Sequence, residues 1–426
     1  MKNKKEKAFT LVELLAVIVI LAVILVIAIP QIMNVIKAAR LSSIKDSAML
    51  IAEQAEKDFL SQQVLNQDYN AKSIDCTDVA KLNDDYASCK ITYNNGIAKV
   101  KLKGKDGGKF SGIICKGTKD NMNCKEKVQL EGYTDAEEYF TNLYNNGSNS
   151  VGLIQTNSTE LRYQGSDPNN YVTFNGEEAG WRIVGIFDGR IKLVRKDSLR
   201  TYSWDTSVQT GDDAINEGRG VNEWSQADLM NELNGDYLDT SLTADTTWYN
   251  GRGNQKTETF TYTNRLSSDA QGLIDDAVWY LGGMPYSSTI PLEEAYTYER
   301  GNTTCQASGT IGCLYNGVSD GVERTLRWTG KVGLIYPSDY GYASGNSNCA
   351  TNMETNGNCD NNWMGSYGWV ISPISSFANG VWVAFASNVN INVASTAIVI
   401  HPSVYLVSGV QVKGTGTSGD PFVFAE

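Results

Sequence analysis

The first thirty residues contain one uninterrupted hydrophobic run. Positions 14–29 are sixteen consecutive apolar residues. From Phe9 to the start of this run, only Thr10 and Glu13 are polar. At a helical rise of about 1.5 Å per residue, such a stretch is long enough to cross the ~30 Å hydrocarbon core of a bilayer. We therefore predict a transmembrane helix over residues 9–29.

Beyond Pro30 the pattern becomes amphipathic. Apolar residues recur mostly at steps of three or four, which places them on one face of a helix. They are Ile32, Val35, Ile36, Ala39, Ile44, Ala48, Ile51, Ala52, Ala55 and Phe59. We expect the helix to end near Gln62, and we expect Pro30 to bend or loosen it because proline lacks a backbone donor. The first half can pack with other subunits, and the second half can support a small sheet.

Charged residues indicate the orientation of the hydrophobic run. Four lysines precede it: Lys2, Lys4, Lys5 and Lys7. The positive-inside tendency therefore leaves the N-terminus in the cytoplasm and the rest of the chain outside. A secretory signal peptide and a plain membrane anchor are the simplest alternatives. However, Glu13 is a carboxylate inside the apolar run, where it costs about 2.5–3.5 kcal/mol, so it needs a partner.

The sequence AFTLVELL, which starts at Ala8, resembles the prepilin peptidase site of type IV pilins and pseudopilins. The resemblance implies that the chain is cut before Phe9 and that the new N-terminus at Phe9 is methylated. It also implies that Glu13 pairs with the N-terminal amine of a neighbouring subunit. Pro30 matches the proline that follows the apolar segment in this family.

The cleavage site departs from the family at one position. The family usually has glycine before the cut, where this chain has Ala8. Because alanine is the smallest available replacement, we expect residues 1–8 to be removed as a basic leader peptide, at an equal or lower rate.

The pattern changes from helix to strand after the amphipathic segment. Residues 89–93 and 97–102 predict two strands, and Asn94-Asn95-Gly96 between them predicts a hairpin turn. A further strand is expected over 110–115. These strands predict a small antiparallel sheet packed on the helix, as in a pilin.

Composition changes near Val128 in three respects. Residues 9–128 have 15 Lys and 1 Arg, whereas residues 129–426 have 5 Lys and 11 Arg. The net charge is +3 in the first segment and −18 in the second, and all nine Trp lie in the second. We therefore predict a pilin-like domain over 9–128 and a separate external domain over 129–426.

The external domain has the pattern of a loop-rich, β-dominated fold, which makes the whole chain α+β. Its predicted strands are 171–174, 181–187, 190–194, 332–336, 368–371, 381–386, 397–407 and 422–424. Helices are expected from Ser225 to Leu233 and from Ser268 to Gly282, because each Ser is followed three residues later by an acid or amide, as in a capping box. Long polar loops such as 239–265 are typical of binding surfaces.

This domain is weakly similar to the lectin-like fold of C-type lectins and formylglycine-generating enzymes, in which the terminal strands pair and long loops face one side. The resemblance rests on WRIVG at Trp181, GWVI at Gly368 and PSVYL at Pro402. The calcium-lectin signatures Glu-Pro-Asn and Trp-Asn-Asp do not occur in the sequence.

The eight cysteines fall into near neighbours. The pairs are Cys76/Cys89, Cys115/Cys124, Cys305/Cys313 and Cys349/Cys359. An even count in an external protein favours four local disulfides, although eight cysteines allow 105 full pairings. The spacing does not suit a zinc knuckle, and a catalytic thiol is disfavoured because each cysteine has a nearby mate.

Acidic clusters offer two alternative chemistries, which we disfavour. Oxygen ligands for Ca²⁺ could come from Asp167, Asn169, Asn170, Glu177 and Glu178, but Tyr171 breaks the EF-hand pattern. Paired glycosidase carboxylates could come from Asp212-Asp213, Asp275-Asp276 or Glu293-Glu294. Adjacent acids usually point apart at a surface, so we expect neither a metal nor a cofactor.

The remaining candidates have simpler structural interpretations. His401 is the only histidine, which excludes any site with two imidazoles, and its apolar neighbours favour a packed, hydrogen-bonded side chain. Trp363, Tyr340 and Tyr342 could stack on sugars, but core packing is the more common role for each.

These features together predict a non-enzymatic type IV pilin-like subunit, minor or at the tip, whose external domain serves adhesion or surface recognition. Its expected partners are prepilin peptidase, other pilin subunits, the membrane, and a surface glycan or protein. A charge of −18 disfavours nucleic acid as a ligand. The alternatives are a pseudopilin of a secretion or DNA-uptake system, and a membrane-tethered extracellular enzyme.

Overall fold

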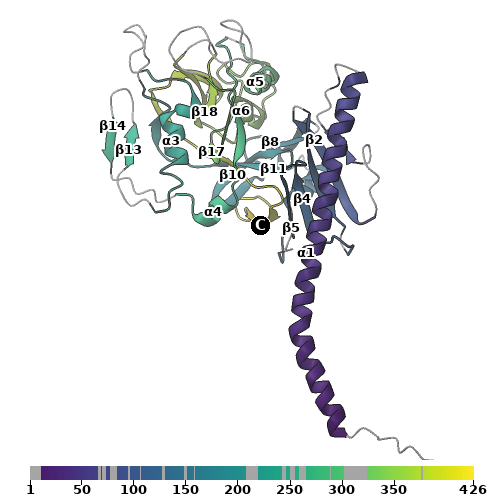
Figure 1. Ribbon diagram of the computed structural model, residues 1–426. Coiled ribbons are helices and arrows are strands. Elements are labelled where there is room, and N and C mark those ends of the chain that lie inside the picture. Colours follow the sequence, from purple (N-terminus) through teal and green to yellow (C-terminus); the bar gives the residue numbers. More distant parts are fainter. Residues whose placement is uncertain are drawn as a thin grey trace, which may run out of the picture. The chain divides into compact units, whose positions relative to one another are not determined.

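The computed structural model (Figure 1) describes most of the chain, as two compact units: Met1–Gln129 (unit 1) and Leu130–Glu426 (unit 2). The described residues are 11–65, 69, 73–76, 84–94, 96–105, 107–126, 130–147, 151–157, 159–207, 219–241, 246–249, 255–258, 265–287, 289–301, 324–375 and 378–426. The chain is a mixed α+β protein in which strands predominate.

Unit 1 is one long helix packed on one antiparallel sheet. Helix α1 spans Leu11–Leu65 and continues without a break through Pro30, three residues past the predicted end. The strands are β1 (Ser73–Asp75), β2 (Tyr86–Asn94), β3 (Ile97–Gly104), β4 (Ile113–Gly117) and β5 (Met122–Glu126). They pair in chain order, each antiparallel to the next. The predicted hairpin turn joins β2 to β3, where Gly96 has a φ of +79°.

Small side chains let α1 lie directly on the sheet. Ala48, Ala52 and Ala55 are fully buried and face β3, β4 and β5. Along β3 buried and more exposed residues alternate, as expected for a strand with one covered face. Its inward residues include Val100 and Leu102, which belong to the same core as the three alanines.

Polar contacts fix the register between α1 and the sheet. The Tyr93 hydroxyl donates to the backbone oxygen of Ala55 over 3.1 Å. Glu56 accepts from the backbone N–H of Ala98 over 3.2 Å and pairs with Lys119 at 2.8 Å. These contacts tie one turn of α1 to the β2–β3 hairpin and to the β4–β5 turn.

The strand predicted over 110–115 begins later than expected. Residues before Ile113 form a turn, closed by a 3.0 Å bond from the Ile113 N–H to the Phe110 oxygen. Phe110 is buried and stacks on Tyr86 with ring centroids 5.4 Å apart. The predicted strand was therefore wrong over its first three residues, although Phe110 belongs to the core of unit 1.

Unit 2 consists of many short strands with seven named helical segments among its described residues. The helices are α2 (Ala136–Asn145), η3 (Trp224–Gln226, a 3₁₀ turn), α3 (Asp228–Asn234), α4 (Ser268–Gly272), α5 (Leu292–Glu299), α6 (Pro337–Ala343) and α7 (Asn348–Thr351). The strands are β6 (Thr134–Asp135), β7 (Leu153–Asn157), β8 (Glu160–Tyr163), β9 (Tyr171–Phe174), β10 (Glu177–Phe187), β11 (Arg190–Arg195), β12 (Thr201–Ser203), β13 (Thr246–Tyr249), β14 (Gln255–Glu258), β15 (Ala277–Tyr280), β16 (Arg327–Gly330), β17 (Val332–Gly333), β18 (Gly368–Pro373), β19 (Gly380–Phe385), β20 (Asn388–Val393), β21 (Ala397–Val399), β22 (Ser403–Tyr405), β23 (Gln411–Lys413) and β24 (Phe422–Ala425).

Strand β10 lies at the centre of the main sheet. The order is β17-β22-β11-β10-β9-β24-β23-β6, with β8 also paired to β10 and β7 to β8. Residues 181–187 of β10 are all buried, which explains why apolar residues occupy both faces of the strand instead of alternating with polar ones; the exception is Arg182, which is buried with hydrogen-bond partners. Six fully buried tryptophans fill the core: Trp181, Trp204, Trp224, Trp279, Trp369 and Trp382.

The first and last strands of unit 2 share this sheet. Strand β6 pairs with β23, and β24 runs parallel to β9. A second sheet, β18-β19-β20, forms a separate antiparallel meander. The first and last strands of unit 2 thus belong to one sheet without pairing directly with each other, and this by itself does not establish the lectin-like fold.

The helix predicted from Ser268 to Gly282 was wrong from Leu273 onwards. Ser267 caps α4, which ends at Gly272. The chain then enters β15, whose residues alternate between buried and less buried positions and pair with β16. Ile274, Val278 and Leu281 fit a helical step of three or four, yet Ile274 forms an isolated β-bridge with Leu406, just after β22. Long-range pairing thus overrides the local periodicity.

Three other predictions needed smaller corrections. The strand expected over 332–336 is limited to β17, Val332–Gly333, and Tyr336 already caps α6. The helix expected from Ser225 is a 3₁₀ turn followed by α3, and Asp228 accepts from the Thr206 backbone and hydroxyl instead of closing a capping box. The single strand expected over 397–407 is two strands, β21 and β22, separated at Pro402. Proline cannot donate to a ladder, and the two strands pair with different partners.

Candidate functional site

The predicted processing site lies outside the described residues. Ala8 and Phe9 both precede the start of α1. The backbone of α1 includes Glu13 and Pro30, but their side chains are outside the described part, so the pairing predicted for Glu13 stays a prediction. Among the residues searched, no helix is both long and apolar enough to span a membrane.

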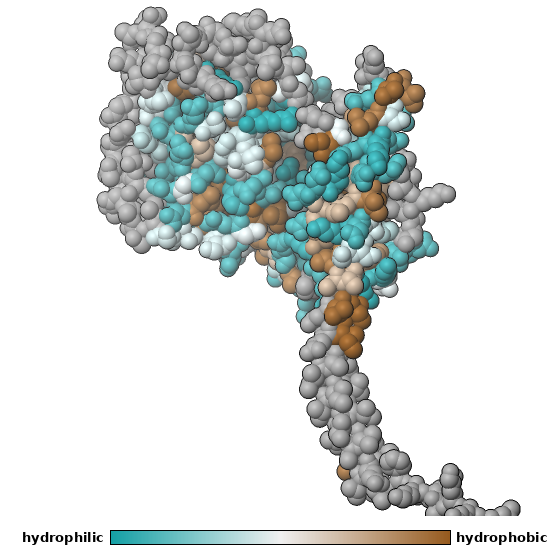
Figure 2. All heavy atoms as spheres, viewed as in Figure 1, coloured by the Kyte–Doolittle hydropathy of each residue, from teal (hydrophilic) through white to brown (hydrophobic). Residues whose placement is uncertain are grey.

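The described part of α1 exposes apolar side chains where it emerges from the sheet. Ile32, Val35 and Ile36 are 57%, 69% and 46% exposed. Figure 2 shows hydrophobic residues gathered on α1 there, next to the mostly polar surface of the sheet region. Apolar groups gathered in this way on a helix are typical of surfaces that associate with other apolar elements.

Three of the four predicted disulfides are present in the structure. Cys76–Cys89 links the end of β1 to β2, and Cys115–Cys124 joins directly opposed residues of β4 and β5. The third is Cys349–Cys359 in unit 2. The fourth predicted pair, Cys305 and Cys313, lies outside the described residues.

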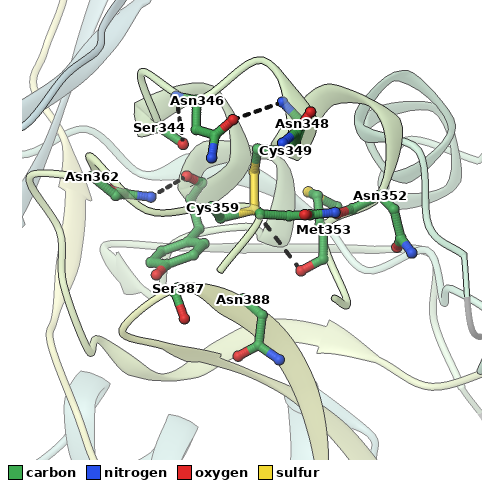
Figure 3. The surroundings of a disulfide bond; sticks show 12 residues. Ser344, Asn346, Asn348, Cys349, Asn352, Met353, Cys359, Asn362, Ser387 and Asn388 are labelled. Carbon is green, nitrogen blue, oxygen red and sulfur yellow. Dashed lines mark hydrogen bonds between the residues drawn. A yellow bond between two sulfur atoms is a disulfide. The ribbon is translucent and has the colours of Figure 1, made fainter. Parts of the chain in front are cut away.

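The Cys349–Cys359 bridge closes an asparagine-rich loop (Figure 3). Many of its amides are bonded within the loop or to the β19–β20 turn. Asn346 donates to Asp360 over 2.7 Å, and Asn388 donates to the Glu354 backbone over 2.8 Å. Since these bonds fix side chains at the surface, the loop presents a shaped polar surface.

Three of the five residues considered, and disfavoured, as calcium ligands contact arginines. Asp167 pairs with Arg182 at 3.4 Å, and Glu177 pairs with Arg195 at 2.9 Å. Asn170 is buried and accepts from Arg182 over 2.5 Å. No group of three or more potential metal ligands occurs within the described ranges. These side chains therefore stabilise the β9–β10–β11 region rather than converge on a cation.

The acids considered, and disfavoured, as glycosidase carboxylates contact other side chains where partners are seen. Asp275 pairs with Arg190 and Asp276 with Lys331, at 3.4 and 3.8 Å. Glu294 accepts from the Tyr298 hydroxyl. The pair at positions 212 and 213 lies outside the described residues.

The candidate sugar-stacking aromatics point into the core. Tyr340 is fully buried, and the Trp363 indole N–H donates to the Tyr163 oxygen over 2.9 Å. The half-buried Tyr342 packs against the Arg162 guanidinium, 4.6 Å from the ring centroid. These positions favour a structural role for all three rings.

His401 is packed and hydrogen-bonded, as its apolar neighbours predicted. Its ring stacks on Tyr367 with centroids 4.2 Å apart, and Nδ1 lies 3.0 Å from the Arg195 carbonyl oxygen. A carbonyl only accepts, so Nδ1 bears the proton. Burial lowers the pKa of His401 to about 4, despite the favourable bond to Arg195.

A buried ionic cluster in unit 2 was not predicted. Asp339 on α6 accepts from Arg162 on β8 and from Lys192 on β11, both over 2.6 Å. Arg162 also pairs with Glu160 at 3.1 Å. The side chains of Arg162, Lys192 and Asp339 are at most 1% exposed. A lysine at position 192, inside an apolar strand run, was the one sequence signal that could have revealed the cluster.

A neighbouring buried carboxylate extends this cluster. Glu299, at the end of α5, accepts from the Ser338 backbone over 2.7 Å and pairs with Arg300 at 3.0 Å. Burial raises the pKa of Glu299 to about 7, although Arg300 and Ser338 oppose the shift. Burial would also raise the pKa of Asp339, but Lys192 and Arg162 outweigh it and lower that pKa to about 2.

Because His401 is buried in its neutral form, the folded protein should become less stable at acidic pH. Its pKa in the folded protein lies below its ordinary value of 6.5, so its contribution is fully present above pH 6.5 and is lost as the pH falls towards 4. The loss should reach about 3 kcal/mol at pH 4. Urea unfolding of wild type and His401→Asn between pH 4 and 7 measures it. The variant should lose correspondingly less stability over this interval, and an identical pH dependence would contradict the assignment.

Comparison with known proteins finds a family match for the N-terminal segment of the chain. Residues 3–29 match the family model described as the prokaryotic N-terminal methylation motif. No curated protein and no solved structure matches the chain, so the lectin-like resemblance of residues 129–426 stays unconfirmed. The chain thus carries the signature of type IV pilins and pseudopilins, and this motif implies a membrane-anchored protein that is processed by prepilin peptidase and assembled with other pilins.

Proposed function

We propose that this protein is a minor or tip subunit of a type IV pilin-like filament, and that unit 2 serves adhesion or surface recognition. The observation that carries the proposal is the match of residues 3–29 to the methylation motif at the start of a 55-residue helix. In the proposal α1 is the assembly element and unit 2 is the presented domain.

Helix α1 has the two surfaces that this function needs. Around Ala48 and Ala52 it is covered by the sheet of unit 1, whereas Ile32 and Val35 are exposed. Exposed apolar side chains on a helix are stabilised when other apolar groups cover them. A bilayer or a bundle of identical helices can provide this cover.

The size and charge of unit 2 favour recognition at a filament end. It comprises about 300 residues, Leu130–Glu426, and a domain of that size on every subunit would crowd a helical filament. Its net charge of −18 opposes contact with nucleic acid and anionic lipid. Fixed asparagine, serine and threonine groups, as on the Cys349–Cys359 loop, suit hydrogen bonding to a glycan or a protein.

The proposal treats the protein as non-enzymatic. Among the carboxylates considered for catalysis, Asp275 and Asp276 pair with cations and Glu294 accepts a hydrogen bond. His401 is buried. A pseudopilin role in secretion or DNA uptake uses the same N-terminal motif and is the second candidate. Its DNA-uptake form conflicts with the acidic charge of unit 2.

Processing should leave Phe9 as the first residue of the mature chain. Removal of residues 1–8 takes away a net charge of +3, so the side-chain charge changes from −12 to −15. N-terminal sequencing of the membrane fraction, together with the mass of the first peptide, tests both the cut and the added methyl group. A chain that still starts at Met1, or that is cut beyond Ile29, would contradict the pilin assignment.

Replacing Glu13 should separate membrane insertion from assembly. Glu13→Ala removes a costly intramembrane charge, so insertion should be unchanged or easier. Assembly should fall by about 10- to 100-fold, because a charge-assisted bond worth roughly 1.5–3 kcal/mol is lost. The measurement is the amount of protein in sheared filaments relative to membranes.

A matched control is Glu53→Ala. Glu53 lies on the same helix, where it forms an exposed pair with Lys57 at 2.7 Å. This variant should enter filaments normally, because exposed pairs contribute little. Normal incorporation of Glu13→Ala would show that Glu13 has another role.

A further inference from the structure

Lys192 and Asp339 meet in the interior of unit 2 with no solvent between them. The amine Nζ lies 2.6 Å from the carboxylate Oδ2, and both side chains are 0% exposed. The residues are 147 positions apart and lie on different elements, β11 and α6. Aromatic rings surround the amine, with Nζ 4.2 Å from the Tyr336 centroid and 5.0 Å from that of Trp279.

We propose that Lys192 and Asp339 condense to an intramolecular isopeptide bond that cross-links β11 to α6. Nζ attacks the carboxyl carbon Cγ, the Nζ–Cγ bond forms and the Cγ–Oδ2 bond breaks. Two of the three ammonium protons leave with Oδ2 as water, and the third stays on the amide nitrogen. The ion pair therefore contains every atom of the products, and no oxidant, reductant or cofactor is consumed.

Arg162 is placed to assist this reaction. Its Nη1 donates to Oδ1, the oxygen that Lys192 does not contact and that becomes the amide carbonyl. Negative charge develops on this oxygen when Nζ attacks, and a donor already in position stabilises such a charge. The Tyr336 backbone N–H donates to the departing Oδ2 over 2.9 Å.

Burial favours the amide over the ion pair. Two charges taken out of water carry a desolvation cost of several kcal/mol each, which a neutral amide does not have. The fold holds the two groups at contact distance and excludes water, so the reaction is intramolecular and its reversal by hydrolysis is hindered. In bulk water the equilibrium favours the free amine and carboxylate over the amide. Burial and exclusion of water shift this equilibrium towards the amide.

The surrounding charges stay balanced after condensation. Before the reaction, Lys192 and Arg162 face Asp339 and Glu160. Afterwards Arg162 still has Glu160, and Glu160 still accepts from the Tyr296 hydroxyl over 2.6 Å. The bond thus removes one cation and one anion together and leaves no buried charge alone.

The reaction starts from the protonation states of Lys192 and Asp339 in the folded protein. Burial lowers the pKa of Lys192 to about 8, although Asp339 opposes the shift. The neutral amine that attacks is therefore accessible close to neutral pH. Lys192 and Arg162 keep Asp339 ionised, so the carboxyl group receives its proton from Nζ across their hydrogen bond.

Peptide mapping of the purified full chain tests the proposal without any variant. After reduction and denaturation, trypsin should not cleave after Lys192. Residues 191–195 should instead be recovered joined to the peptide that contains Asp339, with a combined mass lower by one water molecule. A folded protein that yields separate, unmodified peptides with cleavage after Lys192 would overturn the proposal.

Two substitutions sharpen the test. Lys192→Arg retains the positive charge but lacks the nucleophilic amine, so the Asp339 peptide should be recovered unjoined at its full sequence mass. Lys196→Arg changes an exposed lysine near the end of the same strand and should leave the cross-link in place. If the peptides stay joined in Lys192→Arg, the link involves other residues and the assignment is wrong.

Discussion

The close packing of α1 on its sheet is the constraint on which the architecture of unit 1 depends. Alanines at positions 48, 52 and 55 let the helix lie directly on β3, β4 and β5. Larger residues there would separate the two layers or strain them. One helix can therefore hold a folded domain along its second half and leave its first half for a membrane or for other helices. Because α1 is one continuous helix, the sheet is held at a fixed distance along the helix from its first half.

Unit 2 depends on a different kind of interaction. Asp339 links α6 to β8 and β11 through Arg162 and Lys192, in a core that also contains six fully buried tryptophans. Buried ion pairs are weak sources of stability because desolvation offsets their attraction, but removing one partner is strongly destabilising. The cluster therefore restricts which elements can meet. A covalent link between Lys192 and Asp339 would make that restriction permanent.

The sequence was most informative where structure is local. The long helix, the Asn-Gly turn and three of the near-neighbour cysteine pairs each depend on residues close in the chain, and the structure contains each of them. Prediction failed where distant partners decide. The step of Ile274 and Val278 suited a helix, but pairing with β16 and Leu406 made that segment extended. Lys192 and Asp339 are 147 residues apart, so no local pattern could bring them together.

The central claim is that α1 carries unit 2 into a filament outside the cell. Immunogold electron microscopy with antibodies raised against residues 130–426 tests it most directly, on filaments sheared from cells that make the protein. The account predicts label on the filaments, sparse along their length or concentrated at their ends, and loss of that label when the gene is deleted. Label confined to the cell envelope, beside filaments that are never labelled, would contradict it.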